Sequence, residues 1–333
     1  MRIGIDLGGT KTEIICLDKN NGKELYRQRI PTVRGDYHTT VKSLTDLVEQ
    51  AEKSLGTKGS VGIGIPGTIS NETGLIKNAN STWLIGHPLN KDMENVLKRP
   101  VRIENDANCF AVSESVDGAG AGHALVFGII IGTGCGSGIS IHGKAHAGLN
   151  NIAGEWGHNP LPYPRSFVED PKALTNRFER FEGGQETLHT YFADDETTSE
   201  YPGPLCFCGR RGCLETWISG TGFKNDYRRV TGEEKSTHDI IASAKDDEPK
   251  AVAALDRYTD RLARALAGVI NILDPDVIVA GGGMSNVDAI YDNVPQKWGK
   301  YILSDTVKTQ FLRARHGDSS GVRGAAWLWN DAA

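Results

Sequence analysis

The feature that most constrains the fold of this chain is a hairpin-like pattern that occurs twice. Residues Ile3–Asp18 contain two apolar runs separated by the turn Gly8-Gly9-Thr10, which is typical of two strands joined by a tight turn. Residues Ala124–Ile141 repeat this arrangement around the glycine-rich turn Gly132–Gly136. Strand-like and helix-like patterns follow each copy, so the sequence predicts two similar α/β lobes with a cleft between them.

The length of the chain agrees with two lobes, because 333 residues exceed the usual size of a single compact core. We assign residues 1–120 to an N-terminal lobe and residues 121–333 to a C-terminal lobe. The segment 164–204 is rich in charged residues, Thr, Gly and Pro and lacks apolar periodicity. We therefore expect an inserted loop within the second lobe.

Charge and hydropathy exclude several classes of partner. The formal net charge of −5 gives no overall attraction to nucleic acid or to an anionic membrane surface. No apolar run approaches the roughly 18 residues that span a bilayer, and a strand-like pattern starts at the first residues. We expect a cytoplasmic protein that binds neither nucleic acid nor membrane.

Three glycine-rich turns, each directly after a buried strand, predict a nucleotide site. Backbone N–H groups can surround a phosphate only where no side chain blocks their approach. A single turn of this kind is more often a structural hairpin, but three turns over both repeats favour phosphate binding. Asp6 precedes the first turn and could hold Mg²⁺, and the third turn suits adenosine. The residues expected to contact the nucleotide are Asp6, Gly8, Gly9, Thr10, Lys11, Gly132, Thr133, Gly134, Gly136, Gly138, Gly281, Gly282 and Gly283.

Two common nucleotide-binding folds are excluded by their motifs. The chain lacks the Walker pattern, and it lacks the Gly-x-Gly-x-x-Gly fingerprint in its strand–helix context. The three turns therefore predict neither a P-loop protein nor a Rossmann fold.

Asp106 is the candidate catalytic carboxylate. Transfer of a phosphoryl group to an alcohol requires a carboxylate near the attacking hydroxyl. Asp106 follows a short strand pattern, Val101–Ile103, and precedes a helix-like stretch, Ala107–Val116. Position alone leaves a structural alternative open, because Asn105 and Asp106 are both good N-cap residues for that helix.

Five segments, in order along the chain, resemble the motif series of the ROK family, which contains bacterial sugar kinases and sugar-responsive repressors. The resemblance runs from Ile3 to Trp327 and omits only the segment 164–204. The five segments are DLGGTKTE at Asp6–Glu13, ENDANC at Glu104–Cys109, IGTGCGSG at Ile131–Gly138, GEWGH at Gly154–His158 and CFCGRRGCLE at Cys206–Glu215.

The resemblance implies an α/β fold with two similar lobes of the actin/hexokinase (ribonuclease H-like) type and a central cleft. It implies transfer of phosphate from ATP, with Mg²⁺, to a hexose hydroxyl, and it selects Asp106 as general base. We also expect a homodimer. The positions that match the family's sugar contacts are Asn80, Asn105, Asp106, Glu155, His158 and Glu215.

The residues within and next to two of the motifs predict which sugar the protein phosphorylates. The stretches Asn78–Trp83 and Gly154–Pro160 are similar to those of the bacterial fructokinase/mannokinase group. This similarity implies conversion of fructose to fructose 6-phosphate, with mannose as a further substrate. An N-acetylglucosamine kinase or a glucokinase of the same family is the alternative.

A cluster of cysteines predicts a structural zinc site. Cys206, Cys208 and Cys213 supply three thiolates that suit tetrahedral Zn²⁺, and His158 is the proposed fourth ligand. Four protein ligands would leave no open position for chemistry, so the site would act by shaping the sugar pocket. The alternative is a set of reduced thiols on a loop.

Other classes of protein fit the sequence less well. The repressors of the family carry a helix-turn-helix segment before the first glycine motif, and this sequence starts at that motif. A non-catalytic sugar sensor or an actin-like filament protein could keep the nucleotide cleft. The complete set of predicted catalytic and sugar-binding residues favours a kinase over both.

Overall fold

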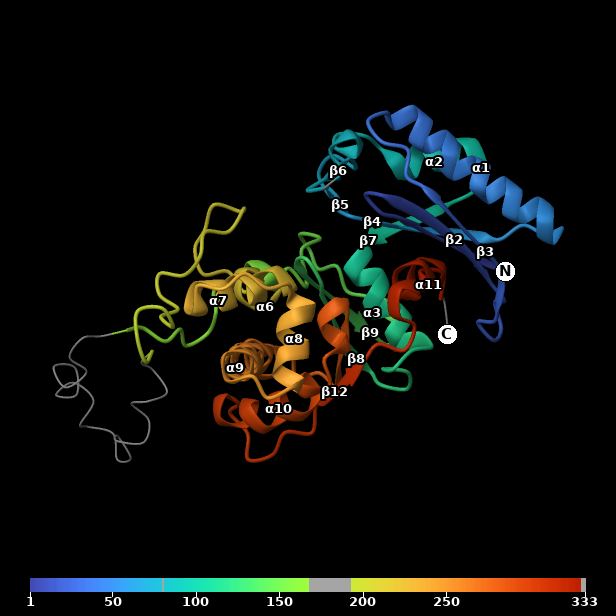
Figure 1. Cartoon of the computed structure of the whole chain (residues 1–333). Helices are drawn as coiled ribbons and strands as arrows, with labels where there is room; N and C mark the ends of the chain where they lie inside the picture. The colour runs from blue at the N-terminus through green and yellow to red at the C-terminus, as the bar shows by residue number, and fades with distance from the viewer. Residues whose placement is uncertain (80, 168–192, 331–333) are drawn as a thin grey trace.

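Two five-stranded sheets of the same topology form the framework of the protein (Figure 1). The computed structural model describes residues 1–79, 81–167 and 193–330. The first sheet has the strand order β3-β2-β1-β4-β7 and the second has the order β10-β9-β8-β11-β12. The strands are β1 (Arg2–Leu7), β2 (Lys11–Leu17), β3 (Glu24–Pro31), β4 (Ser60–Ile65), β7 (Val101–Asn105), β8 (Leu125–Ile131), β9 (Cys135–Ile141), β10 (Lys144–Ala145), β11 (Val277–Gly281) and β12 (Gln310–Arg313).

The two predicted hairpins are confirmed as the first two strands of each sheet. In the first lobe β1 pairs antiparallel with β2 so that Leu7 lies opposite Thr12. In the second lobe β8 pairs with β9 so that Ile131 lies opposite Cys135. Parallel strands then extend each sheet beyond β1 and β8, which is the order expected for two repeats of one α/β unit.

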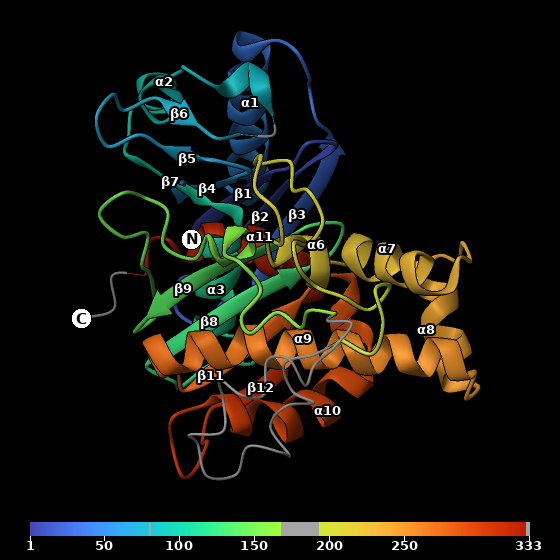
Figure 2. The same ribbon diagram turned by 90° about the vertical axis from the view of Figure 1, so that its left-hand side faces the viewer.

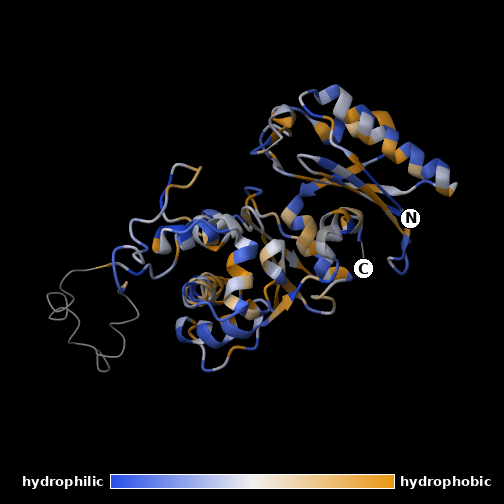
Figure 3. Ribbon diagram, in the orientation of Figure 1, coloured by the Kyte–Doolittle hydropathy of each residue, from blue (hydrophilic) through white to orange (hydrophobic). Residues whose placement is uncertain are grey.

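Helices cover the sheets (Figure 2), and apolar residues of the strands and helices form buried clusters. Figure 3 shows hydrophobic residues along the strands, while α1 carries both hydrophobic and hydrophilic residues, as expected of a helix with one buried face. The long helix α9 has Pro at its first turn, where proline is tolerated. The helices are α1 (Tyr37–Leu55), α2 (Leu89–Leu97), α3 (Asp106–Val116), α6 (Glu215–Ile218), α7 (Gly220–Thr231), α8 (Thr237–Lys245), α9 (Pro249–Leu273), α10 (Asp288–Trp298) and α11 (Ser320–Trp327).

Two helices, α3 and α11, pack against each other between the lobes (Figure 1). A side chain at Gly324 in α11 would overlap the carbonyl oxygen of Cys109 in α3. Side chains at Gly4 and Gly62 would likewise overlap the backbone of α11. Glycine is therefore required at these positions because the backbones approach too closely for any Cβ. The last helix of the chain thus lies against the first sheet.

The predicted insertion 164–204 lies partly outside the described residues. Its described ends are held together, because Glu200 donates its backbone N–H to the carbonyl of Arg165 over 2.7 Å. The Glu200 carboxylate is buried and pairs with Arg261 and Arg264 of α9, both at 2.7 Å. These arginines hold the pKa of Glu200 at about 2, against the opposing effect of burial. Among the described residues, no helix is both long and apolar enough to cross a membrane.

Candidate active site

The junction between β7 and α3 positions the candidate base. Asn105 ends β7, and its side-chain oxygen accepts a hydrogen bond from the N–H of Ala107 at 2.9 Å, so Asn105 is the N-cap of α3. The Nδ2 of Asn105 donates to the carbonyl of Gly67 at 3.3 Å. Asp106 is the first residue of α3, and its Oδ1 accepts from the same Ala107 N–H at 2.8 Å. Asn105 is therefore the N-cap, and Asp106 is the first residue of the helix, where its carboxylate also accepts a hydrogen bond from Ala107.

The carboxylates of Asp6 and Asp106 lie close enough to influence each other. Burial raises the pKa of Asp6 to about 7, and the charges of Asp106 and Glu13 add to the rise. Burial also raises the pKa of Asp106 to about 6, opposed by its bond from Ala107 and assisted by the charge of Glu155. Perturbed carboxylates gathered at one place are typical of a functional site. A cation held between Asp6 and a phosphate would favour the ionised form of Asp6.

The first glycine turn has polar support that the sequence motifs did not reveal. The N–H of Gly8 donates to the carbonyl of Lys11 at 3.1 Å, and nothing lies within 4 Å of a Cβ built at Gly9. The Nε of Arg34 donates to the carbonyl of Gly9 at 2.7 Å. The Oγ1 of Thr32 donates to the carbonyl of Gly8 at 2.7 Å. Both residues follow β3, and only the folded chain brings them to the turn.

The second glycine turn is braced by Glu215. The Oε2 of Glu215 accepts a hydrogen bond from the N–H of Cys135 at 3.0 Å, and a Cβ at Gly134 would lie 2.7 Å from that oxygen. At Gly132 a Cβ would have no atom within 4 Å. A side chain at Gly138 would overlap the backbone of α3, so this glycine permits helix packing. The turn thus combines an open surface at Gly132 with a fixed carboxylate beside it.

In the third glycine turn, two glycines are packed against other residues and one is open. A Cβ at Gly281 would lie 2.6 Å from the ring of Phe110, and Gly282 has φ of 80° and lies against the backbone of Ile131. A Cβ at Gly283 would have no atom within 4 Å. Gly283 is therefore the member of this turn that leaves the backbone open to a ligand.

The predicted metal ligands come together in the folded chain. One ligand atom from each of His158, Cys206, Cys208 and Cys213 lies within 4.8 Å of every other. The Nδ1 of His158 is 3.6 Å from the Sγ of Cys206, and the same distance joins the sulfurs of Cys208 and Cys213. Hydrogen bonds from Arg210 lower the pKa of Cys208 to about 6, which favours the thiolate that metals bind. The set fits a tetrahedral Cys₃His metal site.

The other predicted sugar contacts lie on segments next to this cluster. Glu155 is exposed in the turn before the short 3₁₀ helix Trp156–His158, and Glu215 begins α6. Asn80 lies outside the described residues. Gly67 was missed at the level of sequence, because only its bond to Asn105 in the folded chain connects it with the site.

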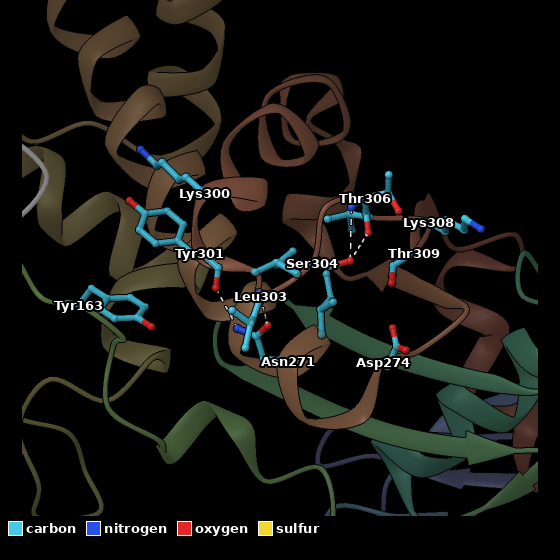
Figure 4. Close-up of a pocket in the computed structure, with 13 residues that line it drawn as sticks. Tyr163, Asn271, Asp274, Lys300, Tyr301, Leu303, Ser304, Thr306, Lys308 and Thr309 are labelled. Carbon is cyan, nitrogen blue, oxygen red and sulfur yellow. Dashed lines mark hydrogen bonds between the residues drawn. The ribbon is translucent and has the colours of Figure 1, made fainter. Parts of the chain in front are cut away.

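A large cavity of the C-terminal lobe lies away from these residues. It has a volume of about 960 Å³ and lies between α9 and the segment that leads to β12 (Figure 4). Tyr163 and Tyr301 stack at one end with ring centroids 5.6 Å apart. Neither Asp106 nor any other predicted site residue lines it.

The two sheets of equal topology, each with a glycine turn after its first strand, and the carboxylates of Asp6 and Asp106 in the first lobe define a two-lobed α/β protein of the actin/hexokinase-like class. The chain belongs to the ROK family, whose model matches residues 2–332. The N-acetyl-D-glucosamine kinase of Yersinia pseudotuberculosis serotype O:1b (strain IP 31758) is 38% identical over 328 residues, which are 98% of each chain. That of Vibrio cholerae serotype O1 is 37% identical over 330 residues, 98% of this chain and 99% of the relative.

Solved structures agree with this assignment. The ROK hexokinase from Thermus thermophilus has a TM-score of 0.78 and 26% identity, with 98% of this chain and 97% of that chain covered. A ROK family glucokinase from Streptomyces griseus, in complex with glucose and AMPPNP, has a TM-score of 0.69, 26% identity and 98% coverage of both chains. The predicted family and fold class are confirmed. The names of the relatives favour the alternative, N-acetylglucosamine, over the fructose predicted from the motifs.

Proposed function

We propose that this chain is an ATP-dependent sugar kinase that transfers the γ-phosphoryl group of ATP to a hydroxyl of N-acetyl-D-glucosamine. The observation that carries the proposal is the pair formed by Asp6 in β1 and Asp106 at the start of α3, whose carboxylates lie close enough for the charge of Asp106 to raise the pKa of Asp6. Relatives that are named N-acetyl-D-glucosamine kinases match almost the whole chain and supply the choice of sugar.

Each residue of the site has a role in this proposal. Asp106 accepts the proton of the attacking hydroxyl, and the hydrogen bond that its Oδ1 accepts from the N–H of Ala107 orients the carboxylate. Asn105, Glu155 and Glu215 contact sugar hydroxyls. Asp6 would hold Mg²⁺, which neutralises phosphate charge when bound. The open backbone at the three glycine turns would bind the phosphates and adenosine.

The metal cluster has a supporting role in the proposal. His158, Cys206, Cys208 and Cys213 would hold a structural Zn²⁺, since their four ligand atoms fit tetrahedral coordination and leave no position for a substrate. Fixing His158 also fixes the turn that carries Glu155. The homodimer remains a prediction, which light scattering of the purified protein would test.

The proposal is tested by comparing kcat/KM for N-acetyl-D-glucosamine, glucose, mannose and fructose with saturating Mg-ATP. We expect N-acetyl-D-glucosamine to give the highest value, and ADP release to depend on added sugar. A higher value for fructose would restore the prediction made from the motifs. Sugar-independent ATP hydrolysis at the same rate would show that the chain is not a sugar kinase.

A further inference from the structure

We propose that Asn151 is a positioning residue that holds the two walls of the sugar site at a fixed separation. The inference rests on the proposed sugar kinase activity. It concerns a set of hydrogen bonds between the lobes that is separate from the packing of α3 against α11. Asn151 belongs to none of the motifs that indicated the function.

The hydrogen bonds join a loop of the second lobe, residues 146–153, to a small hairpin of the first lobe. We call this loop the bridge loop, and the hairpin consists of β5 (Thr68–Ile69) and β6 (Ile76–Lys77). The Nδ2 of Asn151 donates to the carbonyl of Ile69 at 2.8 Å and to the Oδ1 of Asn71 at 2.7 Å. In return, the Nδ2 of Asn71 donates to the carbonyl of Leu149 at 2.6 Å.

One backbone hydrogen bond attaches the bridge loop to β9 of its own lobe, and another closes the loop on itself. The N–H of His146 donates to the carbonyl of Ile139 in β9 at 2.8 Å, and the N–H of Ala153 donates to the carbonyl of Ala147 at 3.0 Å. Asn151 has φ of 53°, a left-handed conformation that asparagine adopts more readily than most residues. Both the backbone and the side chain of position 151 therefore favour asparagine.

The bridge lies close to two residues that we propose contact the sugar, Asn105 on one side and Glu155 on the other. Ile69 follows closely after Gly67, whose carbonyl accepts the hydrogen bond from Asn105. Asn151 comes shortly before Glu155 in the same loop region. Loss of the Asn151 side-chain amide would let the segment that carries Glu155 move relative to Asn105. The glycine turns and Asp106 are placed by the strands and by α3, so ATP binding would not depend on this bridge.

The experiment uses Asn151→Gly, because glycine keeps the left-handed backbone while it removes the amide. We expect the KM for N-acetyl-D-glucosamine to rise by about tenfold or more, as for the loss of two hydrogen bonds. The KM for ATP should change less than about twofold, and kcat should change little. Asn150→Ala is the matched control, since Asn150 joins the bridge through its carbonyl, 3.4 Å from the Nζ of Lys77.

Two outcomes would overturn the inference. One is a wild-type KM for sugar in Asn151→Gly, and the other is an equal rise in the KM values for sugar and ATP. Asn71→Ala tests the bridge from the opposite lobe if Asn151→Gly fails to fold. If Asn151→Gly does fold, the double variant Asn71→Ala/Asn151→Gly should raise the KM for sugar by less than the product of the two single effects.

The bridge can be tested even if the proposed activity fails. If the wild-type protein phosphorylates none of the four hexoses, the proposed function is wrong, and hydrogen exchange then tests the bridge. Amides in the bridge loop should exchange faster in Asn71→Ala than in Asn150→Ala. Equal exchange in the two variants would overturn the inference by itself.

Discussion

Replacement of Asp106 by Asn should make the protein more stable while it removes activity. Burial raises the pKa of Asp106 from 3.8 to about 6, so ionisation of this carboxylate opposes folding. At about 1.4 kcal/mol for each pH unit, the rise corresponds to about 3 kcal/mol at pH 8. This value is an upper bound, because Asp106 is only partly buried and water screens its charge. Asn keeps the oxygen that accepts from Ala107 and carries no charge.

The sign of the pH dependence follows from the direction of the pKa rise. Between pH 4 and pH 6 the folded state binds more protons than the unfolded state, so wild-type stability falls as pH rises through this window. The Asp106→Asn variant lacks this dependence because the position no longer titrates. Its stability advantage over the wild type should therefore be largest at pH 8 and about half as large at pH 5.

Urea denaturation of the two proteins at both pH values, without sugar, nucleotide or Mg²⁺, measures this difference. The same samples should show a loss of kcat of about 10²- to 10⁴-fold for Asp106→Asn, the range for removal of a general base. Stability of the variant equal to or below wild type at pH 8 would refute the argument. An advantage that does not change with pH would refute the assigned cause.

Three further predictions concern pH, metal and packing. The wild-type kcat/KM for sugar should fall about tenfold per pH unit below pH 6, as Asp106 becomes protonated, and a flat profile down to pH 5 would exclude it as the base. Cys208→Ser should lose the bound metal, seen by elemental analysis, and raise the KM for sugar more than the KM for ATP; zinc content equal to wild type would contradict the assigned ligands. Gly324→Ala should destabilise the fold by about 1–3 kcal/mol or more because its Cβ overlaps the backbone of α3, whereas Gly299→Ala, with open space around it, should change stability by less than about 0.5 kcal/mol.

Local patterns in the sequence predicted those parts of the protein that local interactions create. The hairpins around Gly8–Thr10 and Gly132–Gly136 could be predicted because apolar alternation and turn glycines act over a few residues. The clustering of Cys206, Cys208 and Cys213 could be predicted for the same reason, since the three lie within one short segment. The repeat of the whole unit then predicted two sheets of equal topology.

The sequence could not predict the role of a residue where that role depends on its contacts in the folded chain. Asn105 and Asp106 were equivalent as N-cap candidates, and the structure gives the cap to Asn105. Glu215 was predicted as a sugar contact, yet its bond to Cys135 also braces a glycine turn 80 residues away. The residues of the motifs predicted fructose, whereas relatives that match almost the whole chain are named N-acetyl-D-glucosamine kinases.

By itself, the sequence determined the duplicated α/β units, the glycine turns and the cluster of three cysteines, because these features arise from neighbouring residues. Only the tertiary structure decided that α11 returns to the first sheet, that the carboxylates of Asp6 and Asp106 lie close enough to interact, and that Asn151 bridges the lobes. The physical reason is that burial, charge interaction and hydrogen bonding depend on distance in space. Residues far apart in the chain reach that distance only in the folded protein.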